Sequence, residues 1–374
     1  MPETLTTIYL TVDTELSSAH FRRHGGAGLQ DNFESAILGR TSAGDFGILY
    51  QMDRLDAHGL KGVFFVDPLV ALVAGSDMVR RIVHPILDAG HDVQLHAHTE
   101  WLGMAAHGPT DGRGGQNMAD FSTADQVRIL DYGMARLVEA GAPAPVAFRA
   151  GNYGANDDTL EALGRVGIRY DSSYSPDYEG SVCRISLDRD CALPVQRGRV
   201  VEVPVSAIAG PGGGHRHAQL TALSAREMID ALAHAALHRQ PCFTIVSHSF
   251  ELLCRQRRRP NRIVVRRFDR LCGIIAASPR LRAGTYAADP PEPVPQCAAQ
   301  SAGTGQVGRL PHSLARSLLR VGEQAISNSL YGDQVGPLPA QAAAPAFAVR
   351  DRLIAPLQSL TPLQQIALDI MMAV

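Results

Sequence analysis

The segment 91–101 contains residues whose types and spacing suit a metal ion. An alternating apolar stretch leads into His96, His98 and Glu100, which lie two residues apart from one another. In an extended chain, residues two apart share a face, so two imidazoles and a carboxylate would converge on one point. Such nitrogen and oxygen donors suit a divalent cation such as zinc. The alternative interpretation is an ordinary polar strand end exposed to solvent.

Further polar side chains follow other predicted strands, and the elements that position them alternate regularly. In α/β barrels, active sites assemble from residues at the carboxyl ends of the strands. The residues that occupy such ends here are Asp13, Glu15, Arg149, Asp171 and His248.

The apolar patterns predict a strand followed by a helix about seven times, which is typical of parallel sheets with right-handed crossovers. We therefore expect an α/β fold, a distorted (β/α) barrel of about seven parallel strands. An open doubly wound sheet is the second choice, since no glycine fingerprint follows the first strand. Segment 16–46 is rich in Gly, Ser and Arg, and we expect a surface excursion there. The predicted strands are 6–12, 61–66, 91–97, 146–149, 168–172, 200–205 and 242–247, and the predicted helices are 47–58, 78–87, 122–139, 156–166, 224–238 and 263–277.

The composition changes near Gly284, which divides the chain into two expected parts. Residues 1–284 would form the barrel, and residues 285–374 a linker with a C-terminal helical extension. Segment 289–308 is mostly Pro, Ala, Gln and Gly, which is typical of linkers. Segments 312–330 and 361–372 have helical periodicity. The extension would dock on the barrel or on a partner, and the sequence leaves both open.

The overall composition excludes several classes of protein. The net charge of −2 gives no general attraction to nucleic acid or membranes. The six cysteines show no CxxC spacing, which argues against a thiolate zinc site and a disulfide framework. No apolar run approaches the ~18 residues of a membrane span, and no basic and apolar leader pattern begins the chain. We expect a cytoplasmic protein without a membrane span.

An arginine run, 255–267, follows His248 closely. A solvated loop and helix face is the default interpretation. The functional alternative is a patch for an anionic glycan, a lipid-linked sugar phosphate or a nucleotide sugar. Nucleic acid is not expected as a partner, because aromatic residues are not interleaved with the arginines.

Taken in order, these motifs resemble those of the polysaccharide deacetylase family, carbohydrate esterase family 4, over about residues 5–280. The segment 11–15 (TVDTE) resembles the family's first motif, a strand that ends in two acidic residues. His96 matches the start of the second motif, His-x-x-x-His, in which Glu100 replaces the second histidine. Arg149 and the residues after it resemble the third motif, 171–173 the fourth, and 246–248 the fifth.

The resemblance implies a role for each matching residue. Asp13 would be the general base, Arg149 would keep it ionised, and His248 would be the general acid. Glu15 and His96 would hold a divalent metal, most simply Zn²⁺. The departure at Glu100 leaves the third ligand open: either Glu100 binds the metal, which favours Mn²⁺ or another oxygen-tolerant metal, or His98 binds it and Glu100 orients an imidazole.

The substrate-facing roles are also implied by the resemblance. A backbone N–H in the Asn152–Tyr153 turn would meet the oxyanion, and Asp171 would lie near the substrate. Trp101, the only tryptophan, would either stack on a sugar or belong to the core.

The implied activity is metal-dependent removal of acetyl groups from an amino sugar or an acylated glycan. One alternative is an amidohydrolase of a small cyclic amide or ureide on the same barrel. Another is a non-catalytic carbohydrate-binding relative.

Overall fold

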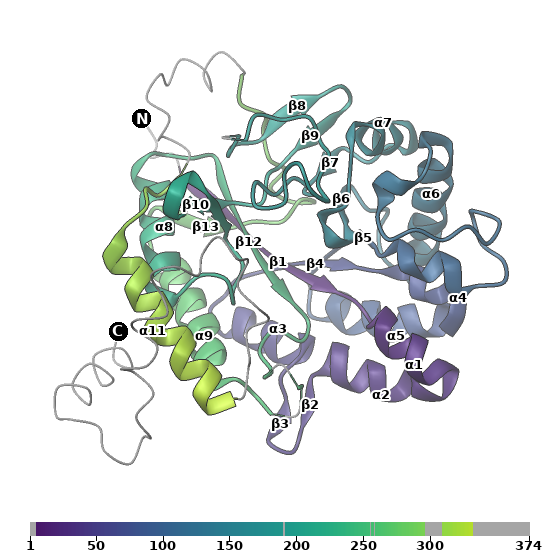
Figure 1. Cartoon of the computed structure of the whole chain (residues 1–374), viewed down its shortest axis with the longest axis horizontal. Helices are drawn as coiled ribbons and strands as arrows, with labels where there is room; N and C mark the ends of the chain where they lie inside the picture. Colours follow the sequence, from purple (N-terminus) through teal and green to yellow (C-terminus); the bar gives the residue numbers. More distant parts are fainter. Residues whose placement is uncertain (1–4, 190, 255, 258, 296–308, 332–374) are drawn as a thin grey trace.

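In the computed structural model of the chain, a curved and mostly parallel β-sheet is surrounded by helices (Figure 1). The structure describes residues 5–189, 191–254, 256–257, 259–295 and 309–331. In these residues the order β12-β1-β4-β5-β6-β7-β9 is parallel throughout, β8 is antiparallel to β9, and β13 pairs with the start of β1. The strands are β1 (Thr6–Thr14), β4 (Val63–Val66), β5 (Asp92–Ala97), β6 (Ala147–Ala150), β7 (Tyr170–Asp171), β8 (Val195–Arg197), β9 (Val200–Glu202), β12 (Cys242–His248) and β13 (Leu281–Ala283).

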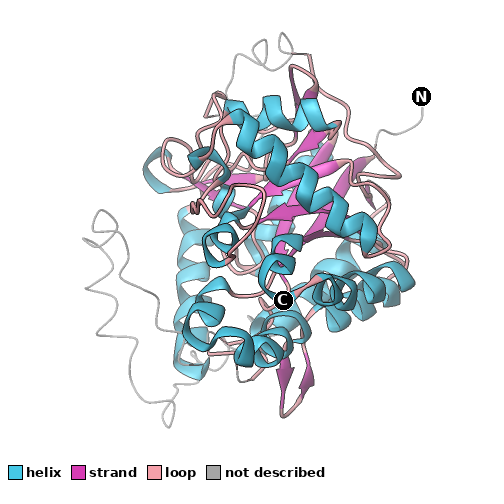
Figure 2. Cartoon of the chain, turned by 90° about the vertical axis from the view of Figure 1, so that its right-hand side faces the viewer, coloured by secondary structure: helices cyan, strands magenta, loops and turns pink. Residues whose placement is uncertain are grey.

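Helices cover the outside of this sheet, and two small hairpins lie beside it (Figure 2). The helices of the crossovers begin and end close to the predicted positions, because the sequence provides residues that cap their N-termini. The side chains of Ser122, Asn156 and Ser224 each accept a hydrogen bond from a backbone N–H of the first turn. The helices are α1 (Ser18–His24), α2 (Leu29–Phe33), α3 (Ile48–Ala57), α4 (Ala71–Ala74), α5 (Ser76–Asp88), α6 (Thr123–Glu139), α7 (Asp157–Val166), α8 (Ala225–Leu237), α9 (Arg262–Ala277) and α11 (Leu314–Tyr331), and the hairpins are β2 (Arg40–Thr41) with β3 (Gly44–Asp45) and β10 (Ala207–Ala209) with β11 (His215–His217).

The gap between the last parallel strand, β9, and the first, β12, is closed by segment 203–220, which includes the hairpin of β10 and β11. Ser206 N donates to Thr244 O at 3.2 Å, and Val246 N donates to Ala218 O at 2.9 Å. Leu220 N then donates to Val246 O, also at 2.9 Å. Since β10 and β11 pair with each other and not with the main sheet, this closure is irregular, and the prediction of a distorted (β/α) barrel is confirmed.

The alternation of side chains along β1 explains how the barrel is filled. Ile8, Leu10 and Val12 belong to the large core shared with the helices. Tyr9, from the opposite face, packs in a separate core, and its ring stacks on Tyr286 at 4.8 Å. Tyr286 is fully buried although it lies beyond residue 284. The division of the chain at residue 284 stays a prediction.

The expectation of a surface excursion at 16–46 holds for residues 17–31, none of which is buried, and is wrong for the residues around Phe33 and Ile37. The segment forms α1, α2 and the π-helical turn Glu34–Leu38, and Phe33 and Ile37 are buried in the large core. Its apolar residues are few and separated by Gly, Ser and Arg, so the periodicity is too weak to reveal these short helices.

The predicted helix at 312–330 is α11, which packs along α8 and α9 (Figure 1). Arg267 pairs with Glu323, and Asn261 donates to Ser327 Oγ at 3.1 Å. The predicted helix 361–372 and most of the predicted linker 289–308 lie outside the described residues. Within the described part of the chain, every helix is too short or too polar to cross a membrane.

Candidate metal centre and active site

Register places the predicted residues at one end of the barrel. Because parallel strands run in the same direction, their carboxyl ends share an edge. Asp13 on β1 lies opposite His248 on β12, and His96 on β5 lies opposite Arg149 on β6. Glu15 follows directly after β1. The motifs are far apart in sequence but adjacent in the sheet.

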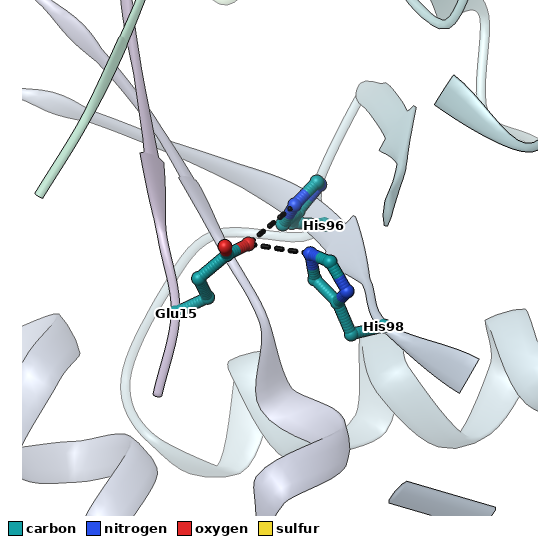
Figure 3. Close-up of side chains that lie close together, drawn as sticks. All are labelled: Glu15, His96 and His98. Carbon is teal, nitrogen blue, oxygen red and sulfur yellow. Dashed lines mark hydrogen bonds and ion pairs between the residues drawn. The ribbon is translucent and has the colours of Figure 1, made fainter. Parts of the chain in front are cut away.

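Glu15, His96 and His98 form the candidate metal centre (Figure 3). Glu15 Oε2 lies 3.0 Å from His96 Nε2 and 2.6 Å from His98 Nε2. One ligand atom from each residue lies within 4.8 Å of the others. The extended backbone at His98 puts it on the same face as His96, as the spacing of two predicts.

The outer contacts of the two imidazoles determine which nitrogen can bind a cation. His96 Nδ1 lies 2.7 Å from the Arg149 carbonyl oxygen, and His98 Nδ1 lies 3.2 Å from Glu100 Oε2. Both partners are acceptors, so each Nδ1 carries the proton and each neutral ring presents a lone pair at Nε2. Two lone pairs and a carboxylate oxygen that face one another repel unless a cation lies among them. The donor set therefore fits a divalent metal.

Without a metal, protonation of the cluster relieves this repulsion. Burial would raise the pKa of Glu15, but His98 and His96 outweigh it and hold that pKa well below its usual value. Burial would lower the pKa of His98, but Glu15 and Glu100 raise it well above its usual value. An imidazolium held between two carboxylates is what a divalent metal would displace, so metal binding is expected to release protons.

Glu100 lies behind His98 and does not reach the cluster. Besides the contact with His98, its carboxylate accepts a hydrogen bond from Asn152 Nδ2 at 3.1 Å. Of the two possibilities for the third ligand, the geometry favours His98 as ligand and Glu100 as the residue that orients it. The arrangement of Glu15, His96 and His98 suits zinc more than an oxygen-rich site would.

Asp13 forms a buried ion pair with Arg149. Arg149 Nη1 lies 2.7 Å from Asp13 Oδ1 and 2.8 Å from Thr11 Oγ1, and the guanidinium also bonds the carbonyl and hydroxyl oxygens of Ser172. Its Cζ lies 4.4 Å from the centre of the Phe65 ring. The guanidinium is fully buried and bonded on several sides, so it is fixed in position. Burial would lower its pKa, but Asp13 outweighs this and raises it above its usual value.

His248 is paired with a carboxylate that the sequence analysis did not single out. Its Nδ1 lies 3.0 Å from Glu251 Oε2, and Glu251 is held by the backbone and hydroxyl of Thr221. Burial would lower the pKa of His248, but Glu251, with smaller contributions from Asp13 and Glu15, raises it to about 9. His248 is therefore protonated at neutral pH, as a general acid must be.

The turn after β6 is strained. Asn152 and Tyr153 both have a φ of +57°, which residues with a side chain rarely adopt. The Tyr153 ring stacks on Tyr178 at 5.2 Å, and its buried hydroxyl has no hydrogen-bond partner among the described residues. Burial and the charge of Asp13 raise the pKa of this hydroxyl well above its usual value. Tyr153 thus offers a neutral O–H donor close to Asp13.

Trp101 and Asp171 have no exposed surface, so the structure favours the core of the two possibilities for Trp101 and does not support a direct contact of Asp171 with substrate. Trp101 is fully buried, donates its Nε1–H to Asp67 Oδ2 at 2.8 Å and meets Phe21 edge-on at 5.7 Å. A sugar ring cannot stack on it. Asp171 is also fully buried and accepts Ser173 Oγ at 2.6 Å. Burial raises its pKa, and burial together with the charge of Asp171 raises the pKa of Glu202 well above its usual value.

Asp67, at the end of β4, also escaped the sequence analysis. It is buried, caps the turn after β4 and anchors Trp101. Burial raises its pKa to about 6, against the opposing effect of His98 and His96. A carboxylate that follows an apolar strand, as in VFFVD, was a signal that could have revealed it.

Comparisons with known proteins gave matches only among solved structures. No family model and no curated protein matches the chain. A Mycobacterium smegmatis protein proposed to be a polysaccharide deacetylase is similar over 84% of this chain and 95% of its own, at 17% identity and a TM-score of 0.49. A Streptomyces lividans family 4 carbohydrate esterase, in complex with acetate, is similar over 82% and 98%, at 12% identity and a TM-score of 0.39.

A pseudoenzyme of the same esterase family from Bacillus anthracis is similar over 83% of this chain and 71% of its own, at 9% identity and a TM-score of 0.40. The solved structures that resemble this chain thus include a family 4 carbohydrate esterase, a peptidoglycan N-acetylglucosamine deacetylase and a pseudoenzyme of the same esterase family. At these identities the likeness concerns the course of the backbone, so the role of each residue has to come from the geometry.

Proposed function

We propose that this protein is a metal-dependent hydrolase that removes acetyl groups from an amino sugar or an acylated glycan. The observation that carries the proposal is the convergence of two imidazole lone pairs and a carboxylate beside the Asp13–Arg149 pair. The resemblance of the motifs to polysaccharide deacetylases supports the acetyl-sugar substrate. A cytoplasmic location stays a prediction.

In the proposed mechanism, Glu15, His96 and His98 hold the metal, most simply Zn²⁺. When bound, such an ion lowers the pKa of water towards ~7 and polarises the acetyl carbonyl. Glu100 orients His98 through Nδ1, and the Arg149 carbonyl oxygen does the same for His96. The chain thereby fixes both imidazoles in the tautomer that the chemistry needs.

Asp13 takes the proton from the attacking water. Arg149 holds the Asp13 carboxylate in position, because the guanidinium is buried and bonded on several sides. His248 gives its proton to the leaving nitrogen or oxygen, and Glu251 keeps the imidazole charged until then. Positioned proton transfer of this kind contributes roughly 10²–10⁴-fold in rate.

The oxyanion would be met by donors of the turn 151–154. The strained backbone at Asn152 and Tyr153 supports a functional role for this turn. The Tyr153 hydroxyl, buried without a partner among the described residues, is a second available donor. The loss of one such donor typically costs about 3 kcal/mol of transition-state stabilisation.

The test combines elemental analysis of purified protein with acetate release. We expect about one equivalent of a divalent metal per chain and acetate release from acetylated chito-oligosaccharides, both lost with a chelator and restored by zinc. A panel of small cyclic amides and ureides, run beside the sugars, tests the amidohydrolase alternative. Bound sugar without any turnover after metal reconstitution would indicate the non-catalytic alternative and contradict the proposal.

A further inference from the structure

Arg257 lies next to the proposed general acid, in the connection between β12 and α9. Its Cζ is 3.7 Å from the centre of the Phe250 ring. Phe250 follows His248 by two residues, and their rings are 5.4 Å apart. Phe250 therefore supports both the imidazole and the guanidinium at the mouth of the barrel.

The arginines of the run 255–267 make different contacts. Arg259 donates to Leu330 O at 2.5 Å and lies over the Tyr331 ring, and Arg267 pairs with Glu323. These two arginines hold α11 on the barrel. The side chain of Arg257 makes neither a hydrogen bond nor an ion pair with the residues that the structure describes, and the Phe250 ring is its neighbour.

The guanidinium of Arg257 interacts electrostatically with Glu15 of the candidate metal centre. Burial lowers its pKa, and the carboxylate of Glu15 counteracts this. Its φ of +53° is one that residues with a side chain rarely adopt. A partly desolvated guanidinium held in a strained turn, without an acidic partner in the described chain, leaves its N–H donors available to a ligand.

We propose that Arg257 binds a carboxylate or phosphate group of the substrate, close to the acetyl group that is removed. This inference rests on the proposed function and narrows its substrate to an anionic acetylated sugar. The planar guanidinium suits such groups because it can donate two parallel hydrogen bonds to their oxygens. A divalent cation bound at Glu15 would engage the carboxylate that opposes the effect of burial on Arg257, and an anionic group of the substrate would take that role.

The inference is tested by the binding of three sugars to the zinc-loaded full chain, measured by calorimetry. The probes are N-acetylglucosamine, which is neutral, N-acetylmuramic acid, which carries a carboxylate, and N-acetylglucosamine 6-phosphate. We expect at least one charged sugar to bind roughly 10- to 100-fold more tightly than the neutral one, as one charge-assisted pair allows. The charged sugar that binds more tightly shows whether Arg257 prefers a carboxylate or a phosphate group.

Variants connect this preference to the residue. Arg257→Gln should abolish it and Arg257→Lys should retain part of it, while Arg262→Gln, which removes an exposed arginine of the same run, should leave it unchanged. Affinities that do not favour a charged sugar, or a preference that survives in Arg257→Gln, overturn the inference. A loss of thermal stability in Arg257→Gln with an unchanged preference also overturns it, because Arg257 would then only pack on Phe250. Acetate release is measured separately, so failure of the proposed function is recognised independently.

Discussion

His98 and Glu100 are hydrogen-bonded through Nδ1 and Oε2 at 3.2 Å, so Glu100 lies on the far side of the imidazole from Glu15. The two residues therefore have different tasks, although both have the chemistry of a metal ligand. His98 presents Nε2 to the cluster, and Glu100 fixes the tautomer and orientation of the ring.

The different tasks predict different effects on metal content. His98→Ala should abolish stoichiometric zinc binding, because two protein ligands remain. Glu100→Gln should keep the metal but weaken its binding by about 10- to 100-fold, the range for residues that orient a ligand. Competition with a chromophoric chelator measures both. Loss of metal in Glu100→Gln equal to that in His98→Ala would instead make Glu100 a ligand.

Asp13 is expected to act in proton transfer and not in metal binding, because its carboxylate is engaged by Arg149. Asp13→Asn should lower kcat by about 10²–10⁴-fold while metal content stays at the wild-type level. Steady-state acetate release and elemental analysis of the same sample check this. Asp131→Asn, on the exposed face of α6, is the matched control and should change neither quantity. A metal-free Asp13→Asn would contradict the assignment.

The pKa of His248 predicts how the rate depends on pH. Since Glu251 raises this pKa to about 9, His248 carries its proton below about pH 9 and loses it above. A general acid must be protonated, so kcat should fall as the pH rises through about 9. Glu251→Gln removes the carboxylate that raises the pKa, and the fall should move to lower pH. An unchanged profile in Glu251→Gln would remove Glu251 from this role.

Much of the barrel could be predicted because its signals are local. The buried strands are short apolar runs, and helices such as α6, α7 and α8 begin at side chains that cap them. The convergence of Glu15, His96 and His98 followed from two regularities: residues two apart share a face of a strand, and parallel strands end at one edge.

The remaining features depend on tertiary contacts that no local pattern reports. The partner of His248 is Glu251, which reaches it only because the chain turns directly after β12. Trp101 is buried because Asp67 receives its N–H, and the two residues are 34 positions apart. The choice between His98 and Glu100 depended on which atom faces Glu15, and sequence spacing cannot resolve that.

Burial of Trp101 predicts a structural role. Trp101→Phe removes the Nε1–H donor and leaves Asp67 Oδ2 buried without it, which should lower the free energy of unfolding by about 1–3 kcal/mol. The KM for an acetylated oligosaccharide should not change, because no part of the ring is exposed. Urea unfolding and steady-state kinetics measure the two effects. A raised KM at unchanged stability would restore Trp101 as a sugar contact.

The close packing of Gly151 against His98 predicts that metal binding depends on a residue that is not itself a ligand. A Cβ at this position would lie 2.8 Å from the Ala97 carbonyl oxygen and 2.8 Å from ring atoms of His98. Since neither the strand nor the turn can easily move, Gly151→Ala should displace His98 and weaken zinc binding by about 10- to 100-fold, as for other changes that disturb a ligand's orientation. Gly26→Ala, which meets open space, is the control for the substitution itself. Unchanged zinc affinity in a folded Gly151→Ala protein would show that His98 is not a ligand in the position seen here.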